Sequence, residues 1–392
     1  MLRYRRRAVV LLVVLTAVLL SLTVYAALRD TTPPQLYVEA PARLPVGASL
    51  ALFASADEPV TLTLEYAGGT LQVVEQETTF DVPAAAGANV AHLVAVDGAG
   101  NETTYDALVI GVPALAPVLS VAKGAVSGDP LGIWVRGLPG AAADPLSSAT
   151  VTDVSLTVAG ESVPLRRLEA EDGTAEYRGA VATVMTVDPT TLDVDMSVVD
   201  EFGRVVTARR QVVLEPLPVT VEQLQIAPSV LAVVTPEGRD LEAQTIAAAW
   251  ENARPDPLWT EPFVQPIEGV TSSGFGDARR YAQGGPVSFH YGLDLAAPQG
   301  TPIHATNDGV VVVAGPYPIK GGWTAIDHGD GVFSYYFHQS KILVAVGDVV
   351  KRGDVIGEVG TTGLSTGPHL HWEMRVRQAA SNPLAWVGKT FP

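Results

Sequence analysis

The amino-acid sequence predicts a mostly β chain of several domains that begins with one apolar helix. Three observations carry this prediction. Residues 31–215 contain many short runs in which apolar and polar residues alternate, with turn-forming Gly, Pro or Asp about every 8–12 residues. Residues 8–28 form one uncharged, apolar run. With 392 residues, the chain has room for about two to four domains of ordinary size.

The composition excludes several kinds of site. The chain has no Cys, which rules out disulfides, thiolate zinc sites and thiol nucleophiles. A transition metal would therefore need His, Asp or Glu ligands. The formal net charge is −17, and residues 31–260 carry the acidity, at −19 against −2 for residues 261–392. We expect no nucleic-acid partner, because binding a phosphate backbone requires a basic face.

The first 28 residues predict export from the cytoplasm. Residues 1–7 contain four Arg and are expected to stay in the cytoplasm by the positive-inside rule. Residues 8–28 are long enough, as a helix, to span about 30 Å of hydrocarbon. We therefore expect a single-pass membrane anchor with the remaining domains outside. A cleaved signal peptide is the alternative: Val24 and Ala26 are small residues suited to a cleavage site, and the chain would then be secreted.

Two β modules follow, over residues 31–113 and 114–218. Both show the alternation typical of strands in a β-sandwich. They share a pattern, V-D-x-x-G-x, at residues 96–101 and 199–204. Asp begins such a turn by accepting hydrogen bonds from the backbone ahead of it, and Gly supplies a positive φ. The two copies lie about one sandwich domain apart. The pattern resembles the late hairpin of bacterial Ig-like domains, so we expect two Ig-like β-sandwich modules.

Residues 219–259 are expected to form a helical linker. Thr235 is the predicted N-cap, and Pro236 suits the first helical position. The helix is expected to span residues 235–253 and to end before Pro255. Its predicted apolar face consists of Leu241, Ile246, Ala249 and Trp250. The last domain, residues 260–392, follows.

Six of the seven His lie in the last domain, and their spacing indicates a metal site. One segment contains His290 and Asp294, another contains His338, and a third contains His369 and His371. In a strand, residues i and i+2 project from one face, so the last two His are expected to share a side. Two His and one carboxylate form a zinc ligand set that leaves a fourth position open for water.

These segments resemble the lysostaphin/LytM-type (M23) zinc metallopeptidase family, whose members are endopeptidases that cut peptidoglycan cross-bridges. The resemblance covers roughly residues 260–388 and includes HYGLDLAAPQGTPIHATNDG, YYFHQS and STGPHLHWE. It implies that one Zn²⁺ per chain is bound by His290, Asp294 and His371. It also implies that His338 and His369 are the unliganded catalytic pair. The fold that it implies is a β-rich peptidase barrel.

The resemblance implies a mechanism as well. Zinc would activate water and polarise the peptide carbonyl. One of the two free His would take a proton from the water, and the other would stabilise the oxyanion or protonate the leaving amine. His304 and His328 lie outside these five positions, and we expect them to be structural. Gln339 stands where the family usually has Leu, a departure that changes the packing beside the site and no ligand.

We therefore expect a zinc-dependent endopeptidase that hydrolyses peptide cross-links of bacterial peptidoglycan at the cell envelope, with the chain anchored in the cell membrane and the two modules as spacers. Two alternatives belong to other classes. One is a catalytically weak or inactive envelope regulator that activates an amidase or scaffolds a cell-wall complex. The other is an adhesion protein whose last domain only holds wall peptides.

The run GDVVKRGDVIGEVG also resembles the strands of lipoyl and biotinyl carrier barrels. Those barrels modify a Lys at a hairpin tip that is flanked by Met or by Asp-Ala. Lys351 lacks these neighbours. We therefore interpret this likeness as one of architecture.

Overall fold

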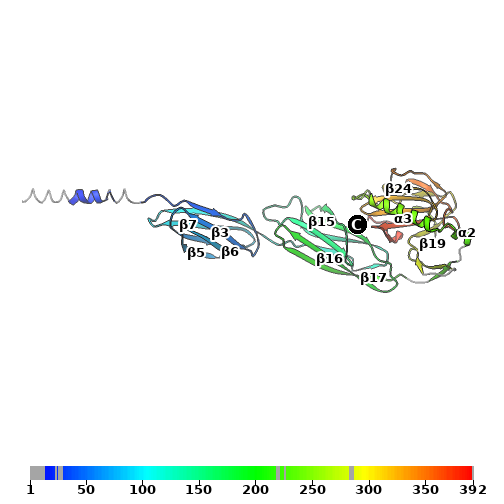
Figure 1. Cartoon of the computed structure of the whole chain (residues 1–392), viewed down its shortest axis with the longest axis horizontal. Helices are drawn as coiled ribbons and strands as arrows, with labels where there is room; N and C mark the ends of the chain where they lie inside the picture. The colour runs from blue at the N-terminus through cyan, green and yellow to red at the C-terminus, as the bar shows by residue number, and fades with distance from the viewer. Residues whose placement is uncertain are drawn as a thin grey trace, which may run out of the picture. The chain divides into compact units, whose positions relative to one another are not determined.

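The computed structural model describes residues 14–22, 24, 30–217, 221–224, 227–281 and 287–390. The chain forms two compact units. One contains residues 1–115, 142–152 and 200–204, and the other contains residues 116–141, 153–199 and 205–392. Both units consist mainly of strands (Figure 1), which confirms the predicted mostly β fold class.

Part of the N-terminal apolar run is helical, over residues 14–22. No helix in the described part of the chain is both long and apolar enough to cross a membrane. Residues 1–7, much of the predicted anchor at 8–28, and Ala26 of the predicted cleavage site lie outside the described residues. The anchor therefore stays a prediction.

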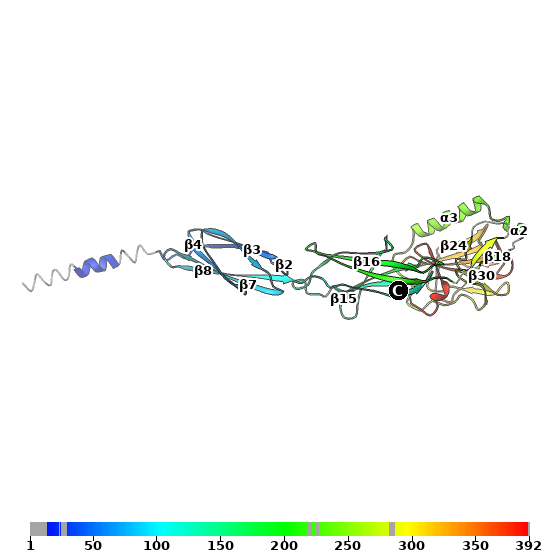
Figure 2. The ribbon, with the colours of Figure 1, turned by 90° about the horizontal axis from the view of Figure 1, so that it is seen from below.

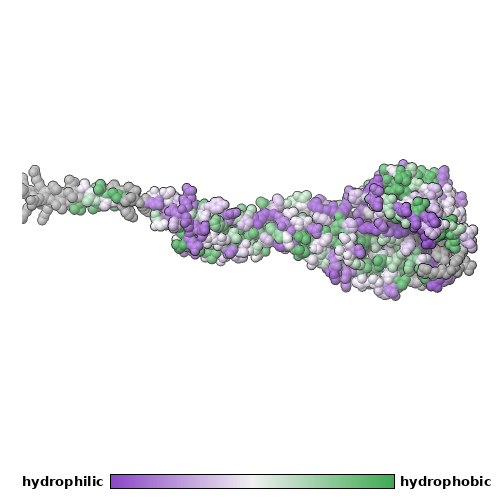
Figure 3. Space-filling model, in the orientation of Figure 1, coloured by the Kyte–Doolittle hydropathy of each residue, from purple (hydrophilic) through white to green (hydrophobic). Residues whose placement is uncertain are grey.

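The first unit contains a two-sheet module. One sheet has the strand order β1-β3-β6 and the other has the order β2-β8-β7-β4-β5. The strands are β1 (Leu36–Glu39), β2 (Arg43–Pro45), β3 (Ser49–Ala56), β4 (Val60–Tyr66), β5 (Gly69–Val74), β6 (Glu77–Pro83), β7 (Gly87–Asp97) and β8 (Glu102–Val112). Leu52 and Phe80 of the first sheet share one buried core with Leu62 and Leu93 of the second. The two-sheet architecture expected here is present, and its Ig-like character stays a prediction. Hydrophilic residues gather on the visible face of this module, with smaller hydrophobic groups between them (Figure 3).

A second two-sheet module lies in the other unit. Its sheets have the orders β10-β17-β16-β12-β13 and β14-β15-β11-β9. The strands are β9 (Val118–Val121), β10 (Gly124–Val126), β11 (Pro130–Pro139), β12 (Val151–Val158), β13 (Glu161–Ser162), β14 (Arg166–Glu169), β15 (Thr174–Ala182), β16 (Thr190–Asp200) and β17 (Val205–Glu215). Ala180 of β15 belongs to the hydrophobic core of the last domain, and its carbonyl oxygen accepts a hydrogen bond from Arg377. This module therefore packs directly against the last domain.

The turn that the two modules share forms the predicted hydrogen bonds. Asp97 Oδ1 accepts from the backbone N–H groups two and four residues ahead, at 2.8 Å each. Asp200 Oδ1 does the same at 3.0 Å each. Gly100 and Gly203 have φ values of 86° and 73°, in the left-handed region that glycine adopts without strain. The pattern V-D-x-x-G-x thus predicted a real structural repeat.

The last domain is built on one eight-stranded sheet with the order β19-β22-β30-β26-β25-β24-β28, in which β31 also pairs with β30. Its strands are β19 (Val270–Ser273), β22 (Leu293–Ala296), β24 (Gly309–Tyr317), β25 (Gly321–Gly329), β26 (Val332–Gln339), β28 (Val349–Val350), β30 (His369–Val376) and β31 (Ala379–Ser381). Two small sheets accompany it, β18-β20-β21 and β23-β29-β27. Their strands are β18 (Glu222–Leu224), β20 (Ala278–Tyr281), β21 (Ser288–Phe289), β23 (Pro302–His304), β27 (Lys341–Ile342) and β29 (Val355–Glu358).

The prediction of a peptidase barrel is wrong in one respect, because the main sheet of the domain is open. β19 and β28 are its outer strands, and over the described ranges they pair with one neighbour each. A closed barrel needs two partners for every strand. The two outer strands have only four and two residues. The apolar alternation that predicts a barrel strand is the same in an open sheet, so the sequence pattern did not separate the two.

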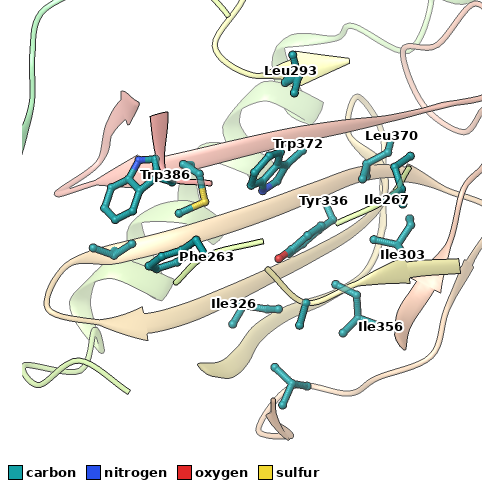
Figure 4. Packing of buried hydrophobic residues seen from close by; sticks show 14 of the residues in the cluster. Phe263, Ile267, Leu293, Ile303, Ile326, Tyr336, Ile356, Leu370, Trp372 and Trp386 are labelled. Atoms are coloured by element: carbon teal, nitrogen blue, oxygen red, sulfur yellow. The ribbon is translucent and has the colours of Figure 1, made fainter. Parts of the chain in front are cut away.

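The sheet packs apolar side chains on both of its faces. On one face, Leu370 and Trp372 of β30 pack with Tyr336 of β26 and with Phe263 and Trp386 in a fully buried core (Figure 4). Alternate residues of a strand point to opposite faces. The neighbouring residues of β26 therefore belong to a second cluster on the other face, and that cluster includes Phe333, Tyr335 and Phe337. Positions 369, 371, 373 and 375 of β30 share this second face.

Helix α3 (Pro236–Glu251) lies against this second cluster, beside β24 (Figure 2). As predicted, Thr235 caps it, accepting a hydrogen bond from the Gly238 N–H at 3.0 Å. A short helix, α2 (Pro228–Leu231), precedes it, and a 3₁₀ turn, η1 (Pro383–Ala385), lies near the C-terminus.

The predicted apolar face of α3 needs one correction. Ile246, Ala249 and Trp250 pack against the sheet as expected. Leu241, however, is 48% exposed, and Glu242 beside it is only 3% exposed. The helical period of 3.6 residues places 242, 246, 249 and 250 on one face. The prediction gave more weight to the apolar character of Leu241 than to its position on the helix.

Candidate metal centre

The register of three adjacent strands brings the predicted site residues together. β22 pairs antiparallel with β30, with Asp294 directly opposite His371. His369 lies two residues earlier on β30, so it projects from the same face. β26 flanks β30 on its other side, and His338 lies at its end. His290 lies between β21 and β22. All five residues therefore meet although they are far apart in the sequence.

His290, Asp294 and His371 place three possible ligand atoms around one point. Asp294 Oδ1 lies 2.7 Å from His371 Nδ1 and 3.1 Å from His290 Nε2. The two ring nitrogens are 2.9 Å apart. A carboxylate oxygen and a deprotonated imidazole nitrogen each offer a lone pair, so the convergence of these three atoms suits a cation bound between them. Two His and one carboxylate match the ligands of catalytic zinc sites, and these residues therefore fit a zinc ion.

Neighbouring groups orient two of these side chains. His290 Nδ1 donates to the carbonyl oxygen of Gly274 at 2.7 Å, which leaves Nε2 facing the centre. Arg279 donates to Asp294 Oδ2 at 3.1 Å, which leaves Oδ1 for a metal. Arg279 is itself held by a hydrogen bond to the Ser273 hydroxyl. Partners of this kind fix the tautomer and orientation of metal ligands.

The His371 ring is held at its edge and on its face. Its Nε2 lies 3.0 Å from Glu373 Oε1. Phe337 stacks on the ring, with centroids 5.0 Å apart and 3° between the planes. Arg375 Nε donates to the other Glu373 oxygen at 2.7 Å. Glu373 and Arg375 were not predicted as site residues from the sequence, although a signal was present: they follow His371 at intervals of two, on the same face of the strand.

The charges of the site depend strongly on one another. Burial opposes ionisation of Asp294, but its hydrogen bonds with His290 and His371 hold its pKa far below the usual range. Burial also opposes a charge on His371, but its bonds to Asp294 and Glu373 raise its pKa to about 9. Burial lowers the pKa of His290. His371 is thus protonated between two carboxylates, and a metal ion would bind its Nδ1 in exchange for the proton on that nitrogen.

His338 and His369 lie beside the triad, with their ring centroids 4.8 Å apart. Each donates Nδ1–H to a backbone carbonyl oxygen at 2.8 Å, His338 to Thr362 and His369 to Gly367. In the neutral form of each ring, Nε2 is therefore the unprotonated nitrogen. Burial, together with the neighbouring His371 and His369, lowers the pKa of His338 to about 3, which keeps this ring neutral at ordinary pH.

The five residues line an open cleft of about 820 Å³. Its lining also includes Ile319, Lys320, residues 364–368, Arg279 and Tyr291. The volume lies in the usual range of ligand pockets, about 300–1,000 Å³. The cleft is thus large enough for several residues of an extended peptide.

The other two His of the domain lie outside the lining of this cleft. His328 is fully buried; its Nδ1 donates to the Asp308 carbonyl oxygen at 2.7 Å, and its Nε2 lies 2.8 Å from the Ser334 hydroxyl. His304 Nδ1 donates to the Gly353 carbonyl oxygen at 2.8 Å. Both rings have protein partners, as structural residues would.

Comparison with known proteins identifies relatives of this domain. The model of peptidase family M23 matches residues 288–383, which agrees with the resemblance predicted from the motifs. The peptidoglycan DD-endopeptidase ShyB of Vibrio cholerae is 43% identical over 106 residues, 27% of this chain and 25% of its own length. The DD-carboxypeptidase/endopeptidase Mpg of Neisseria meningitidis serogroup B is 47% identical over 96 residues, 24% of this chain and 22% of its own length.

A solved structure, the catalytic domain of lysostaphin from Staphylococcus simulans, is 35% identical. The match covers 30% of this chain and 90% of that domain, with a TM-score of 0.27. The chain therefore spans about a quarter of the length of the curated relatives that it matches and nearly all of one isolated catalytic domain.

Replacing Glu373 with Gln is expected to weaken zinc binding about 10- to 100-fold, the usual effect of losing the outer partner of a metal-binding His. The amide keeps the size of the side chain but removes the negative charge that raises the basicity of His371. Competition with a chromophoric chelator measures the affinity. Glu268→Gln, at an exposed position of the same domain, is the control. Equal affinities for the wild type and Glu373→Gln would show that Glu373 does not act on the ligand.

Proposed function

Because the C-terminal domain belongs to peptidase family M23, we propose that this chain is a zinc-dependent endopeptidase that hydrolyses peptide cross-links of bacterial peptidoglycan at the cell envelope. The observation that carries this proposal is the convergence of His290, Asp294 and His371 beside His338 and His369 in one open cleft. A regulator that only activates an amidase or scaffolds a complex needs neither a ligand triad nor two free imidazoles. The complete set therefore favours the enzyme.

The chain's own residues divide the proposed reaction among them. Zinc held by the triad would act as a Lewis acid that activates water and polarises the peptide carbonyl. His338 and His369 each offer an unprotonated Nε2 that can accept a proton from the attacking water. The ring that takes this proton can then donate it from Nε2 to the leaving amine. The other ring would stabilise the oxyanion as an imidazolium, which donates from its own Nε2. The bonds from Nδ1 to Thr362 and Gly367 keep both rings in the tautomer that this task requires.

The names of the relatives support peptidoglycan peptides as the proposed substrate class. The printed names of two relatives describe a peptidoglycan DD-endopeptidase and a DD-carboxypeptidase/endopeptidase. A cross-link joins two peptide stems, so an enzyme that cuts it needs a cleft open to an extended chain. The cleft of about 820 Å³ around the His residues meets this requirement.

The proposed location is the outer side of the bacterial cell membrane. Four Arg precede the uncharged run 8–28, and in the sequence two folded modules lie between this run and the peptidase domain. The modules would act as spacers that carry the peptidase toward the wall. Fractionation of cells that express the full chain tests this location. Recovery in the membrane fraction is expected, whereas recovery in the medium would indicate that the run is cleaved and the chain secreted.

Substitutions are expected to separate zinc binding from catalysis. Asp294→Ala and His371→Ala should lose both zinc and activity. His338→Ala and His369→Ala should keep about one zinc per chain and lose about 10²- to 10⁴-fold in kcat, the usual effect of removing a general acid or base. His304→Gln is the control and should change neither. Metal analysis and turnover of purified peptidoglycan provide the two measurements. Full activity in Asp294→Ala would rule out the zinc mechanism.

The bond that is cut provides a second test. Mass spectrometry of muropeptides is expected to show cross-linked dimers converted to monomers by the wild-type chain. A zinc chelator should stop this conversion, and added zinc should restore it. Unchanged dimers, together with faster release of stem peptides by an added amidase, would instead identify the regulator.

A further inference from the structure

Helix α3 places one buried carboxylate on the face that packs against the peptidase sheet. Glu242 is 3% exposed, on the side of the helix that also carries Ile246, Ala249 and Trp250. A buried charge is unfavourable unless partners satisfy it. Replacing a buried ion pair with apolar residues is often neutral or stabilising. The partners of Glu242 therefore matter more than its contribution to packing.

Glu242 binds the turn between β24 and β25. Its Oε1 accepts hydrogen bonds from the backbone N–H groups of Ile319 at 2.8 Å and Lys320 at 2.9 Å. Its Oε2 accepts from Lys320 Nζ at 3.0 Å. One side chain of α3 therefore holds two consecutive N–H groups of the Ile319–Lys320 turn and the charged side chain of the same turn.

The Ile319–Lys320 turn reaches the active site directly. The Lys320 carbonyl oxygen accepts from the backbone N–H of His338 at 2.9 Å, and the Ile319 carbonyl oxygen accepts from Leu364 at 2.8 Å. Ile319, Lys320 and Leu364 all line the cleft. His338 has a φ of 61°, a conformation that a residue other than glycine keeps only where its surroundings restrain it. The bond to Lys320 is one of these restraints.

The same turn also touches a metal ligand through an aromatic ring. Lys320 Nζ lies 5.1 Å from the centroid of the Phe337 ring, which in turn stacks on His371. Glu242 fixes Lys320 Nζ at this position. The carboxylate thus acts on the backbone of His338 and on the ring that supports His371.

We infer that Glu242 is a positioning residue for the active site: it holds the Ile319–Lys320 turn so that His338 keeps its place beside the metal ligands. Helix α3 lies outside residues 288–383, which the family model matches. The functional peptidase unit of this chain therefore extends upstream to include α3. The inference rests on the proposed function, because His338 has a catalytic role only in that reaction.

Glu242→Met in the full-length chain tests this role, because Met has a similar size but no acceptor oxygens. Hydrogen exchange measured by mass spectrometry should become at least about tenfold faster in the peptide that contains the Ile319–Lys320 turn. With purified peptidoglycan as substrate, kcat should fall about 10- to 100-fold, as expected when a reacting group is misplaced. KM should change less, and about one zinc per chain should remain bound.

Three further variants separate positioning from general stability. Glu242→Gln keeps one acceptor oxygen for the two N–H groups, so it should retain slow exchange and most of kcat. Glu251→Gln changes an exposed residue at the end of the same helix, and it should alter neither the exchange rate of the turn nor kcat. Glu242→Asp keeps the charge but is one methylene shorter. Glu242→Asp replaces Glu242→Met in the test if that variant does not fold, and the same faster exchange at the turn and the same fall in kcat are expected.

Two results would overturn the inference: wild-type kcat in a folded Glu242→Met or Glu242→Asp chain, or unchanged exchange at the Ile319–Lys320 turn. These results differ from a failure of the proposed function. If the wild-type chain does not cleave peptidoglycan, the proposed function fails. The exchange of the turn and of the peptide that contains His338 still shows whether Glu242 holds them.

Discussion

The antiparallel register between β22 and β30 is the constraint on which the site depends. It sets Asp294 opposite His371, and the alternation of side chains sends His369 to the same face. Leu370 and Trp372 point the other way, into the apolar core. A slip of one residue would exchange the two faces, because the side-chain period of a strand is two. Burial of Leu370 and Trp372 therefore also determines where the proposed metal ligands lie.

The face that carries the site is continuous with the cluster under helix α3. Phe337 of β26 stacks on His371, and Tyr335, two residues earlier, accepts a hydrogen bond from Trp250 of α3 at 3.1 Å. Arg375 lies over the Tyr335 ring, at 5.9 Å from its centroid. Helix α3 thus covers one end of this face, and the other end forms the cleft. The segment that was predicted as a helical linker therefore contains a helix that packs directly on the peptidase sheet.

The residues at the centre of the site could be predicted from the sequence because His290, Asp294, His369 and His371 stand in short, chemically distinctive patterns. Glu242 could not be predicted in the same way. Its partners are 77 and 78 residues away, so no local pattern records them, and a charged residue on a helix is usually exposed. The sequence also could not predict whether the sheet is open or closed, because the alternation of apolar and polar residues is the same in open sheets and barrels.

Charges of opposite sign alternate along the buried contacts of the site. Arg279 pairs with Asp294, Asp294 with His371, His371 with Glu373, and Glu373 with Arg375. Each carboxylate thus has an arginine on its outer side, which offsets the cost of burying it. The oxygens that face His371, Asp294 Oδ1 and Glu373 Oε1, are different atoms from the oxygens that the two arginines bind. A metal ion held by His290, Asp294 and His371 would therefore not compete with either arginine for the same oxygen atom.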